Sequence, residues 1–435
     1  MNKNITLLLF LVVFVMNSFS QKSKCASDLV LSKQLENDPG FAQRLINNES
    51  LVRNWISQNK KNLQSKNGQL QATIPVVFHV VYKNASQNIA DSNLYRQIDI
   101  LNECYRKQNA NFSQTRPIFD SIAADVDIEF CVANTDTNGN WTSGIVRRQA
   151  PNGSFFDPLF GFDNVKSFAS GGSDPWPSDR YLNIWVCDMS LFGLTVVLGY
   201  ATFPGSDPLL DGVVIQYNFM GLQANGTSND KGKTTVHEVG HWLGLRHIWG
   251  DGQNSSTPCD STDYVEDTPN ADSASQQTCL LKNTCSNESN YWNLAGVDPP
   301  DMIENYMDYS YDDCMTMFTE GQKARMLGFL NTLRPNMLNS TIACNFTGLT
   351  GHDPSFYNQF NLFPNPASSD LQIKWRNTTI EKINFSIYSL AGQEIKKGIL
   401  SSENSTIDIS SYDSGIYFLR IENENNSANF KFIKD

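Results

Sequence analysis

Apolar residues recur with two different periods along this chain, and each period predicts a different secondary structure. Residues 74–82 form a run of β-branched and aromatic side chains, which predicts a strand. Between residues 94 and 109 the apolar positions repeat with the period of a helix. Shorter strands are expected over residues 128–132, 182–186, 198–203 and 212–217. This mixture predicts an α/β or α+β domain.

The residues before the first expected strand have a different character. Residues 1–20 contain a short positive region, an apolar run and small residues near the end, which is the pattern of a cleaved signal peptide. A membrane anchor is the alternative, but the run is shorter than the ~20 apolar residues that a spanning helix needs. Residues 21–71 are polar, with a helical rhythm and too little apolar material to fold alone.

The end of the chain predicts a second, smaller unit. Residues 345–358 have the composition of a linker. In residues 359–435, short stretches of alternating apolar and polar residues recur, as in 371–375 and 416–421. This pattern predicts a small all-β module. The main domain is then expected to span residues 72–344.

Composition restricts the class of protein. The chain has 435 residues, of which 40% are hydrophobic, so a principal domain with a core and smaller attachments is expected. The formal net charge of -12 would repel phosphate backbones and argues against nucleic-acid binding. Nine cysteines can form disulfides in an exported protein, and their odd number leaves at least one unpaired.

Three of the five histidines lie within residues 237–247. On a helix, His237 and His241 lie four positions apart on one face, which directs two imidazoles at one metal ion. Gly244 can adopt a positive φ and end the helix, so that His247 supplies a third nitrogen. Three protein ligands leave a fourth position for water, which is typical of catalytic zinc.

Glu238 lies beside the first histidine and is the candidate general base. Zinc lowers the pKa of a bound water toward ~7 and polarises a carbonyl, while the glutamate takes the proton and delivers it to the leaving amine. This chemistry hydrolyses a peptide bond without a covalent intermediate. Surface histidines on an amphipathic helix, or a zinc ion used only for folding, are the alternatives.

The histidine stretch resembles the extended zinc motif of the metzincin clan, whose second mark is a methionine turn under the metal. Residues 305–309, Asn-Tyr-Met-Asp-Tyr, fit that turn. Within the clan, residues 74–338 resemble the pappalysin family. The resemblance implies an α/β (α+β) metzincin-type catalytic domain with an active-site helix and a twisted mixed sheet. It also implies that Met307 lies beneath the metal and that the Tyr309 hydroxyl stabilises the oxyanion, with an ordinary packed tyrosine as the alternative.

The same resemblance implies how the polar stretch between residues 250 and 313 is held. It implies two disulfides, Cys259 with Cys285 and Cys279 with Cys314. Sequence alone does not fix this connectivity. The resemblance also places calcium in this stretch, where we expect the side chains of Asp263 and Thr268 to be ligands. An acidic loop that binds no ion is the alternative.

Two further positions are assigned by resemblance. Asp312 follows the methionine turn, in the wall that shapes the family's pocket for the residue after the cleaved bond. A carboxylate there favours Arg or Lys, so cleavage before basic residues is expected, with Asp313 as a competitor for the role. Cys25 resembles the switch cysteine of latent precursors, whose thiolate occupies the open position on zinc, although its neighbours Lys24 and Ala26 depart from the usual Arg-Cys-Gly. A structural or disulfide-bonded cysteine is the alternative.

The tail, residues 359–435, resembles the C-terminal sorting domain of the type IX secretion system. The resemblance rests on residues 362–366, 387–392 and 415–419. It implies a small β-sandwich that the export machinery recognises and that is removed afterwards. A module that binds a substrate or a glycan is the alternative.

Together these features predict a secreted zinc endopeptidase made as a latent precursor, with residues 21–71 as an inhibitory pro-segment. Its expected partners are protein or peptide substrates and the type IX machinery, with release or surface attachment after export and no transmembrane segment. A binding protein built on an inactive protease fold is one alternative interpretation. Such proteins commonly lose the general base or a metal ligand, whereas Glu238 and all three histidines are present here. A zinc hydrolase of non-peptide substrates is another.

Overall fold

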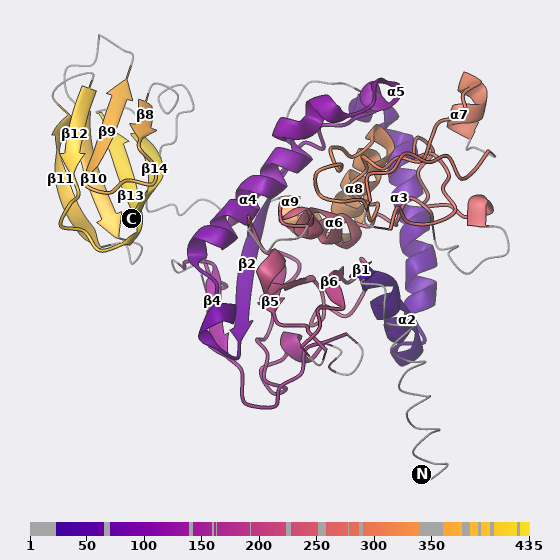
Figure 1. Ribbon diagram of the computed structural model, residues 1–435, viewed down its shortest axis with the longest axis horizontal. Coiled ribbons are helices and arrows are strands. Elements are labelled where there is room, and N and C mark those ends of the chain that lie inside the picture. Colours follow the sequence, from indigo (N-terminus) through magenta and orange to yellow (C-terminus); the bar gives the residue numbers. More distant parts are fainter. Residues whose placement is uncertain are drawn as a thin grey trace. The chain divides into compact units, whose positions relative to one another are not determined.

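The structure is a computed structural model (Figure 1). It describes residues 23–338 and 360–435, except residues 65–69, 139–141, 159–160, 162, 192, 223–227, 251–257, 277, 287–289, 376–382, 390–392, 401–403 and 424–426. The signal peptide expected over residues 1–20 and the linker expected over residues 345–358 lie outside the described residues. The chain divides into two compact units, Met1–Cys344 and Asn345–Asp435.

A seven-stranded mixed sheet forms the centre of the first unit. Its strands are β1 (Ser23–Cys25), β2 (Ala72–Tyr82), β3 (Ile128–Val132), β4 (Ile145–Gln149), β5 (Leu182–Cys187), β6 (Val197–Ala201) and β7 (Val213–Gln216). The order is β1-β6-β7-β5-β2-β3, with β4 also paired to β2. β6 runs antiparallel to β7, whereas β1 pairs with β6 in parallel. β5, β6 and β7 are buried along their whole length, which explains their continuous apolar runs.

Helices pack on this sheet and complete the core. Among those that contact its strands are α4 (Asp91–Tyr105), α6 (Lys233–Trp242) and α9 (Pro335–Leu338), and the unit also contains α5 (Pro117–Asp120), α7 (Asn290–Ala295) and α8 (Glu320–Leu333). α4 contacts β3 and α6, and α6 lies against β6 and β7. One cluster of buried side chains joins Val80 of β2, Leu101 of α4, Val239 of α6 and Leu330 of α8. The helix that carries the histidines is therefore fixed from several sides by the core.

The polar residues 21–71 are called the leader below. They contain two helices, α2 (Ser27–Asn37) and α3 (Phe41–Gln64), after the short strand β1. α3 runs beside α8 (Figure 1), where Gly328 leaves room for Val52: a Cβ on this glycine would lie 2.9 Å from Val52 Cγ1. Trp55 and Leu63 pack against the main core. The leader thus gains its apolar contacts from the rest of the first unit. Neither α3 nor any other helix of the described residues is long and apolar enough to span a lipid bilayer.

The fold class predicted from the sequence is confirmed, with differences at element ends. The helix expected over residues 94–109 stops at Tyr105, because Lys107 adopts a left-handed conformation with φ of 53°. β6 and β7 are shorter than the strands expected over residues 198–203 and 212–217. The sequence pattern did not indicate β4 or α8. β4 has no buried residue, and α8 is covered both by the core and by α3, so neither shows a one-sided apolar stripe.

The second unit consists of two antiparallel sheets, ordered β11-β10-β13-β14 and β12-β9-β8. The strands are β8 (Phe360–Phe363), β9 (Asp370–Trp375), β10 (Ile383–Ser389), β11 (Glu394–Leu400), β12 (Asn404–Asp408), β13 (Gly415–Glu422) and β14 (Ser427–Lys434). Buried and exposed residues alternate along β9, as expected when one face of a sheet packs on a core. Leu371, Ile387, Leu419 and Phe432 belong to a core that is separate from that of the first unit.

Candidate active site

α6 brings two of the three zinc-motif histidines together, and the turn after it brings the third. All ten residues of α6 are buried. The helix ends at Trp242, and Gly244 adopts φ of +91°. A Cβ at Gly244 would lie 2.1 Å from the Phe329 ring, so the turn has room only for glycine. As a result, His241 Nε2 lies 3.1 Å from both His237 Nε2 and His247 Nε2.

The outward-facing nitrogens of the histidines have hydrogen-bond partners that orient the rings. His237 Nδ1 donates to the Tyr306 carbonyl at 2.7 Å, and His241 Nδ1 donates to the Leu245 carbonyl at 2.9 Å. An imidazole that donates from Nδ1 keeps its Nε2 lone pair available. Burial, followed by the neighbouring histidines, lowers the pKa of His237 and His241 well below the usual value. Both rings are therefore neutral, which is the state that binds a metal ion.

The donor set fits zinc. His237, His241 and His247 each direct a nitrogen to one point, and the Cys25 sulfur is part of the same buried group, whose ligand atoms all lie within 4.8 Å of one another. Three nitrogen lone pairs that converge in a buried space repel one another unless a cation lies between them. Three imidazoles and a thiolate are soft to borderline ligands, and four of them match the tetrahedral preference of zinc.

Residues 305–309, which carry Met307, pack against α6 and His237. A Cβ at Gly240 of α6 would lie 2.5 Å from Met307 Sδ, so the helix and the turn are in close contact. The Asn305 side chain accepts a hydrogen bond from Met307 N at 2.9 Å and thereby holds the turn. The Tyr309 ring lies 5.0 Å from the His247 ring, and its hydroxyl donates to the Cys25 carbonyl at 3.2 Å. Tyr309 thus reaches the centre of the site.

Glu238 is buried opposite β6. Gly199 of that strand leaves room for it, since a Cβ at Gly199 would lie 2.8 Å from Glu238 Cγ. Glu238 Oε2 accepts a hydrogen bond from Ser27 Oγ at 3.0 Å and lies 3.3 Å from Cys25 Sγ. Burial raises the pKa of Glu238 to about 8. Ser27 Oγ also accepts from Ala201 N at 2.9 Å, so the leader bridges the glutamate and the strand.

Lys24 occupies a buried polar position beside the site. Its ammonium lies 3.2 Å from Asp312 Oδ1 and donates to the Ser310 carbonyl at 2.9 Å. Both Lys24 and Asp312 have no exposed surface, whereas Asp313 is exposed. The second oxygen of Asp312 accepts from the backbone of Lys231 and Lys233, which fixes the carboxylate. Of the two acidic candidates, Asp312 is the one that faces a basic side chain.

Disulfides fasten the long polar stretch. Cys259 is bonded to Cys285 and Cys279 to Cys314, the pairs that the family resemblance implies.

Asp263 and Asp267 are among the buried carboxylates of the same stretch. Asp263 accepts from Thr268 Oγ1 at 2.8 Å, and Asp267 accepts from Thr319 at the start of α8. Burial raises the pKa of Asp263 to about 7 and that of Asp267 to about 6. Carboxylates in this situation suit a hard cation, which would offset the cost of burying their charge.

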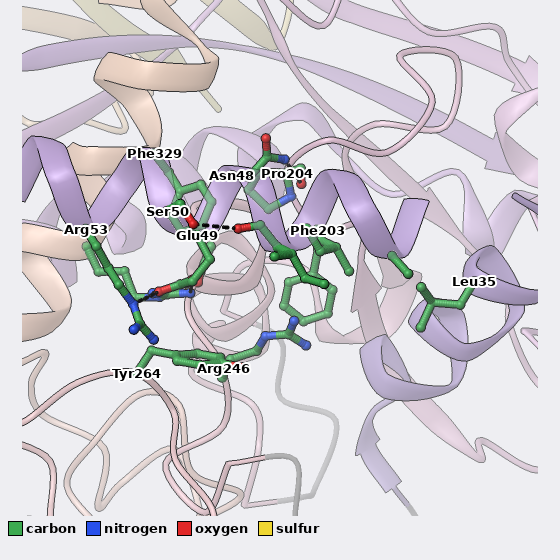
Figure 2. A pocket seen from close by; sticks show the side chains of 15 residues that line it. Leu35, Asn48, Glu49, Ser50, Arg53, Phe203, Pro204, Arg246, Tyr264 and Phe329 are labelled. Carbon is green, nitrogen blue, oxygen red and sulfur yellow. Dashed lines mark hydrogen bonds and ion pairs between the residues drawn. The ribbon is translucent and has the colours of Figure 1, made fainter. Parts of the chain in front are cut away.

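The leader has a second anchor on α3. Glu49 of α3 accepts from both terminal nitrogens of Arg325, at 2.9 and 2.7 Å, and from Arg53 Nε at 3.0 Å. Arg325 also donates from Nε to the Gly244 carbonyl at 2.8 Å. Figure 2 shows Glu49 and Arg53 at a cavity of about 500 Å³ between α3 and the body of the unit. The leader helix is thereby linked to the turn of the zinc motif.

Sequence reasoning missed the roles of Ser27, Asp28 and Glu49. Ser27 contacts Glu238, Asp28 faces His247, and Glu49 pairs with Arg325. The three residues lie in a polar segment where such side chains are common, so nothing in the pattern distinguished them. Lys24 was visible only as a neighbour of Cys25. The parallel pairing of β1 with β6 positions Lys24, Cys25 and Ser27, and the sequence does not encode that pairing locally.

Comparison with known proteins agrees with this geometry. Residues 170–331 match the family model of pregnancy-associated plasma protein-A, and residues 361–435 match that of the secretion system C-terminal sorting domain. An extracellular metalloprotease of Arthroderma gypseum is 30% identical over 275 residues, which cover 62% of this chain and 76% of the relative. One of Sordaria macrospora is 31% identical over 62% of this chain and 78% of the relative.

Two solved structures extend the comparison. A promirolysin mutant of Tannerella forsythia is 37% identical, with a TM-score of 0.62, over 74% of this chain and 100% of that chain. Mature mirolysin of the same organism in complex with a cleaved peptide is 40% identical, with a TM-score of 0.56, over 63% of this chain and 98% of that chain. With these likenesses and a tail that matches a sorting domain, this chain belongs to the pregnancy-associated plasma protein-A family and is a secreted metalloprotease.

Proposed function

We propose that this protein is a zinc-dependent endopeptidase in which His237, His241 and His247 hold the metal and Glu238 is the general base. The observation that carries the proposal is the convergence of three imidazoles beside a buried glutamate. When bound there, zinc would polarise the scissile carbonyl and acidify a water molecule. Binding proteins that share a protease fold have no need to keep this whole set.

The side chains of the chain itself account for the movement of protons. Glu238 accepts a proton from the water that attacks the carbonyl carbon, and delivers it to the amide nitrogen as the carbon–nitrogen bond breaks. The Tyr309 hydroxyl donates to the oxygen that becomes negative, once the Cys25 carbonyl no longer accepts its hydrogen bond. Met307 packs beneath the helix and keeps the two α6 histidines in place.

In the same proposal, residues 21–71 are an inhibitory pro-segment that keeps the enzyme latent. The Cys25 sulfur lies at the fourth position of the metal group, where a substrate or water would bind. Ser27 and Cys25 both contact Glu238, so the base has no access to water. β1 covers the edge of β6, to which an extended substrate would otherwise add as a strand. Removal of the leader would expose all three at once.

We further propose that the enzyme cleaves before Arg or Lys. The buried carboxylate of Asp312 pairs with the buried ammonium of Lys24, so the leader fills this pocket with a basic side chain. A buried carboxylate that loses its partner is costly, and a basic side chain of the substrate would restore the pair. Lys24 therefore stands in for the residue that follows the cleaved bond.

Two attachments complete the proposal. Calcium would bind in the polar stretch, with Asp263 and Thr268 among its ligands, and would neutralise the buried carboxylates that hold this stretch against α8. Residues 359–435 would be the sorting domain that the type IX export machinery recognises, joined by a linker over residues 345–358 to the catalytic domain of residues 72–344.

A peptide library tests both the mechanism and the pocket. The protein without its leader is incubated with the library, and the cut sites are read by mass spectrometry. We expect cuts before Arg and Lys, which Glu238→Ala abolishes while zinc stays bound. Asp312→Asn should lower kcat/KM by about 100-fold for peptides with Arg or Lys after the cleaved bond. The neighbouring Asp313→Asn should leave this kcat/KM unchanged.

The outcomes separate the parts of the proposal. Cuts without a basic preference would refute the assignment of Asp312 alone. A folded, zinc-loaded protein that cuts no peptide after removal of the leader would contradict the peptidase proposal and favour the binding-protein rival.

A further inference from the structure

The three zinc-motif histidines differ in where their second nitrogen finds a partner. His237 and His241 donate from Nδ1 to the carbonyls of Tyr306 and Leu245, which belong to the body of the first unit. His247 Nδ1 faces Asp28 Oδ2 at 3.3 Å, and Asp28 is a leader residue in the first turn of α2. The second nitrogen of one of the three rings therefore faces a residue of the leader.

The surroundings of His247 give Asp28 a defined role. The ring stacks on Trp249 at 4.4 Å with an angle of 8° between the planes, and the edge of Tyr309 meets it at 5.0 Å. These contacts fix the plane of the ring but do not bind its nitrogen. The Asp28 carboxylate lies within ion-pair distance of Nδ1, where a negative charge favours a proton on that nitrogen and leaves Nε2 free to face the other two histidines.

A carboxylate behind a metal-bound imidazole also makes the ring a stronger ligand. Loss of such a partner typically lowers metal affinity by about 10- to 100-fold. The Asp28 side chain is 53% exposed, so water competes for the carboxylate and the lower end of that range applies. The neighbouring Cys25 acts on the same metal group directly, through its sulfur. Two leader residues thus converge on it, one as a ligand and one behind a ligand.

We infer that Asp28 is a positioning residue for His247, through which the leader retains zinc in the precursor. This inference rests on the proposed zinc site and on the proposed latency. The precursor should bind zinc more tightly, and release it more slowly, than the enzyme without its leader. The difference in affinity should be larger than the loss of the Cys25 sulfur alone would cause. Release of the leader would then both open the site and loosen the metal.

The test measures zinc release from the full-length precursor in a Glu238→Ala background, so that no variant can process itself. Zinc-loaded protein is mixed with a coloured chelator, and the rate of transfer is followed. We expect Asp28→Asn to release zinc about 10-fold faster than the parent. Glu36→Gln, an exposed acid on the same helix, should leave the rate unchanged. Asp28→Glu should restore part of the retention.

A second readout separates positioning of the ring from docking of the leader. Cobalt replaces zinc, and the intense absorption of a thiolate bound to cobalt reports whether Cys25 is still in place. Faster zinc release with this band intact supports the inference. A release rate equal to that of Glu36→Gln overturns it, and so does a release that increases only together with loss of the band, because Asp28 would then hold the leader and not the imidazole.

Failure of the underlying proposal would look different. If the parent precursor binds no stoichiometric zinc, or if His241→Ala binds it as tightly as the parent, the zinc site itself is wrong. If zinc binds and depends on His241 but Asp28→Asn has no effect, only the role of Asp28 is lost.

Discussion

Three glycines set the geometry of this site, because a side chain at any of them would collide with a neighbouring residue. Gly244 turns the chain after α6 against the Phe329 ring, and Gly240 and Gly199 let Met307 and Glu238 approach. At each position a Cβ would lie less than 3 Å from a neighbouring atom. The zinc motif therefore depends on contacts that only the folded protein makes.

Gly244→Ala should both destabilise the first unit and displace His247, the proposed third zinc ligand. The added Cβ would lie 2.1 Å from the Phe329 ring, and the φ of +91° is strained for alanine. We expect a loss of about 3 kcal/mol or more in the free energy of unfolding, with zinc content below one ion per chain. Gly153→Ala is the matched control: its φ is +84° but nothing lies within 4 Å. It should lose only about 1 kcal/mol. Equal losses in chemical denaturation would show that the clash is unimportant.

His79 should make the stability of the first unit sensitive to acid. It is buried between Ser173, Asn183 and the Trp185 ring, and burial lowers its pKa to about 4. The unfolded chain takes up this proton below pH ~6.5 while the folded protein resists it to about 4, so stability is full above pH ~6.5 and falls as the pH drops through that window.

His79 should account for a loss of about 2 kcal/mol in the free energy of unfolding when the pH falls from 7 to 5. Denaturation curves of the parent and of His79→Gln at both pH values measure it. His79→Gln is less stable at pH 7 because the glutamine cannot satisfy both partners, but it should lose less stability on acidification. The same acid-induced loss in both proteins would contradict the assignment.

Secondary-structure elements determine how the leader is held. β1 extends the sheet at β6, α2 carries Ser27 and Asp28 into the site, and α3 packs along α8. The three elements are consecutive in the chain and dock together. The leader is therefore anchored both beside the three histidines and along α8.

Glu49→Gln should weaken the outer anchor. The side chain of Arg325 is 5% exposed and that of Glu49 is 19% exposed. Burial alone would raise the pKa of Glu49, but the hydrogen bonds and the charge of Arg325 hold this pKa below its usual value. Removing the charge leaves Arg325 buried without a counter-ion, at a cost of about 3 kcal/mol. We expect a protease added in trace amounts to cut the leader several-fold faster. Arg53→Ala, which removes the more exposed partner of Glu49, should have little effect, and equal effects would refute the anchor.

At the scale of the whole molecule, two units have separate cores. The core of the first unit includes residues of β2, α4, α6 and α8, and the core of the second is built from its own strands. The zinc group, the leader and the disulfides belong to the first unit. Catalysis and export are thus assigned to different parts of the chain.

Deletion of residues 345–435 should separate these two properties. Because the cores are independent, the remaining unit should fold, bind zinc and become active after removal of the leader, with kcat/KM within about twofold of the full protein. In a host with the type IX machinery it should stay inside the cell. Activity assays and cell fractionation measure the two effects. A truncated protein that is still exported would exclude the tail as the sorting signal.

The sequence determined the chemistry of this protein. The spacing of His237, Glu238, His241 and His247 predicts a zinc-hydrolase motif, because a helix places side chains four positions apart on one face. Gly244 predicts the end of that helix, because glycine adopts a positive φ without strain. The main strands were predictable for the same local reason, since buried strands are continuous apolar runs.

Tertiary structure decided what the leader does. The contacts of Lys24 with Asp312, of Asp28 with His247 and of Glu49 with Arg325 each join residues more than 200 positions apart. A polar residue looks the same in sequence whether it faces solvent or a buried partner, because its hydrogen-bonding groups are satisfied either way. Only the packing of the leader on the rest of the first unit, with β1 beside β6 and α3 beside α8, brings these ordinary polar residues to His247, Asp312 and Arg325.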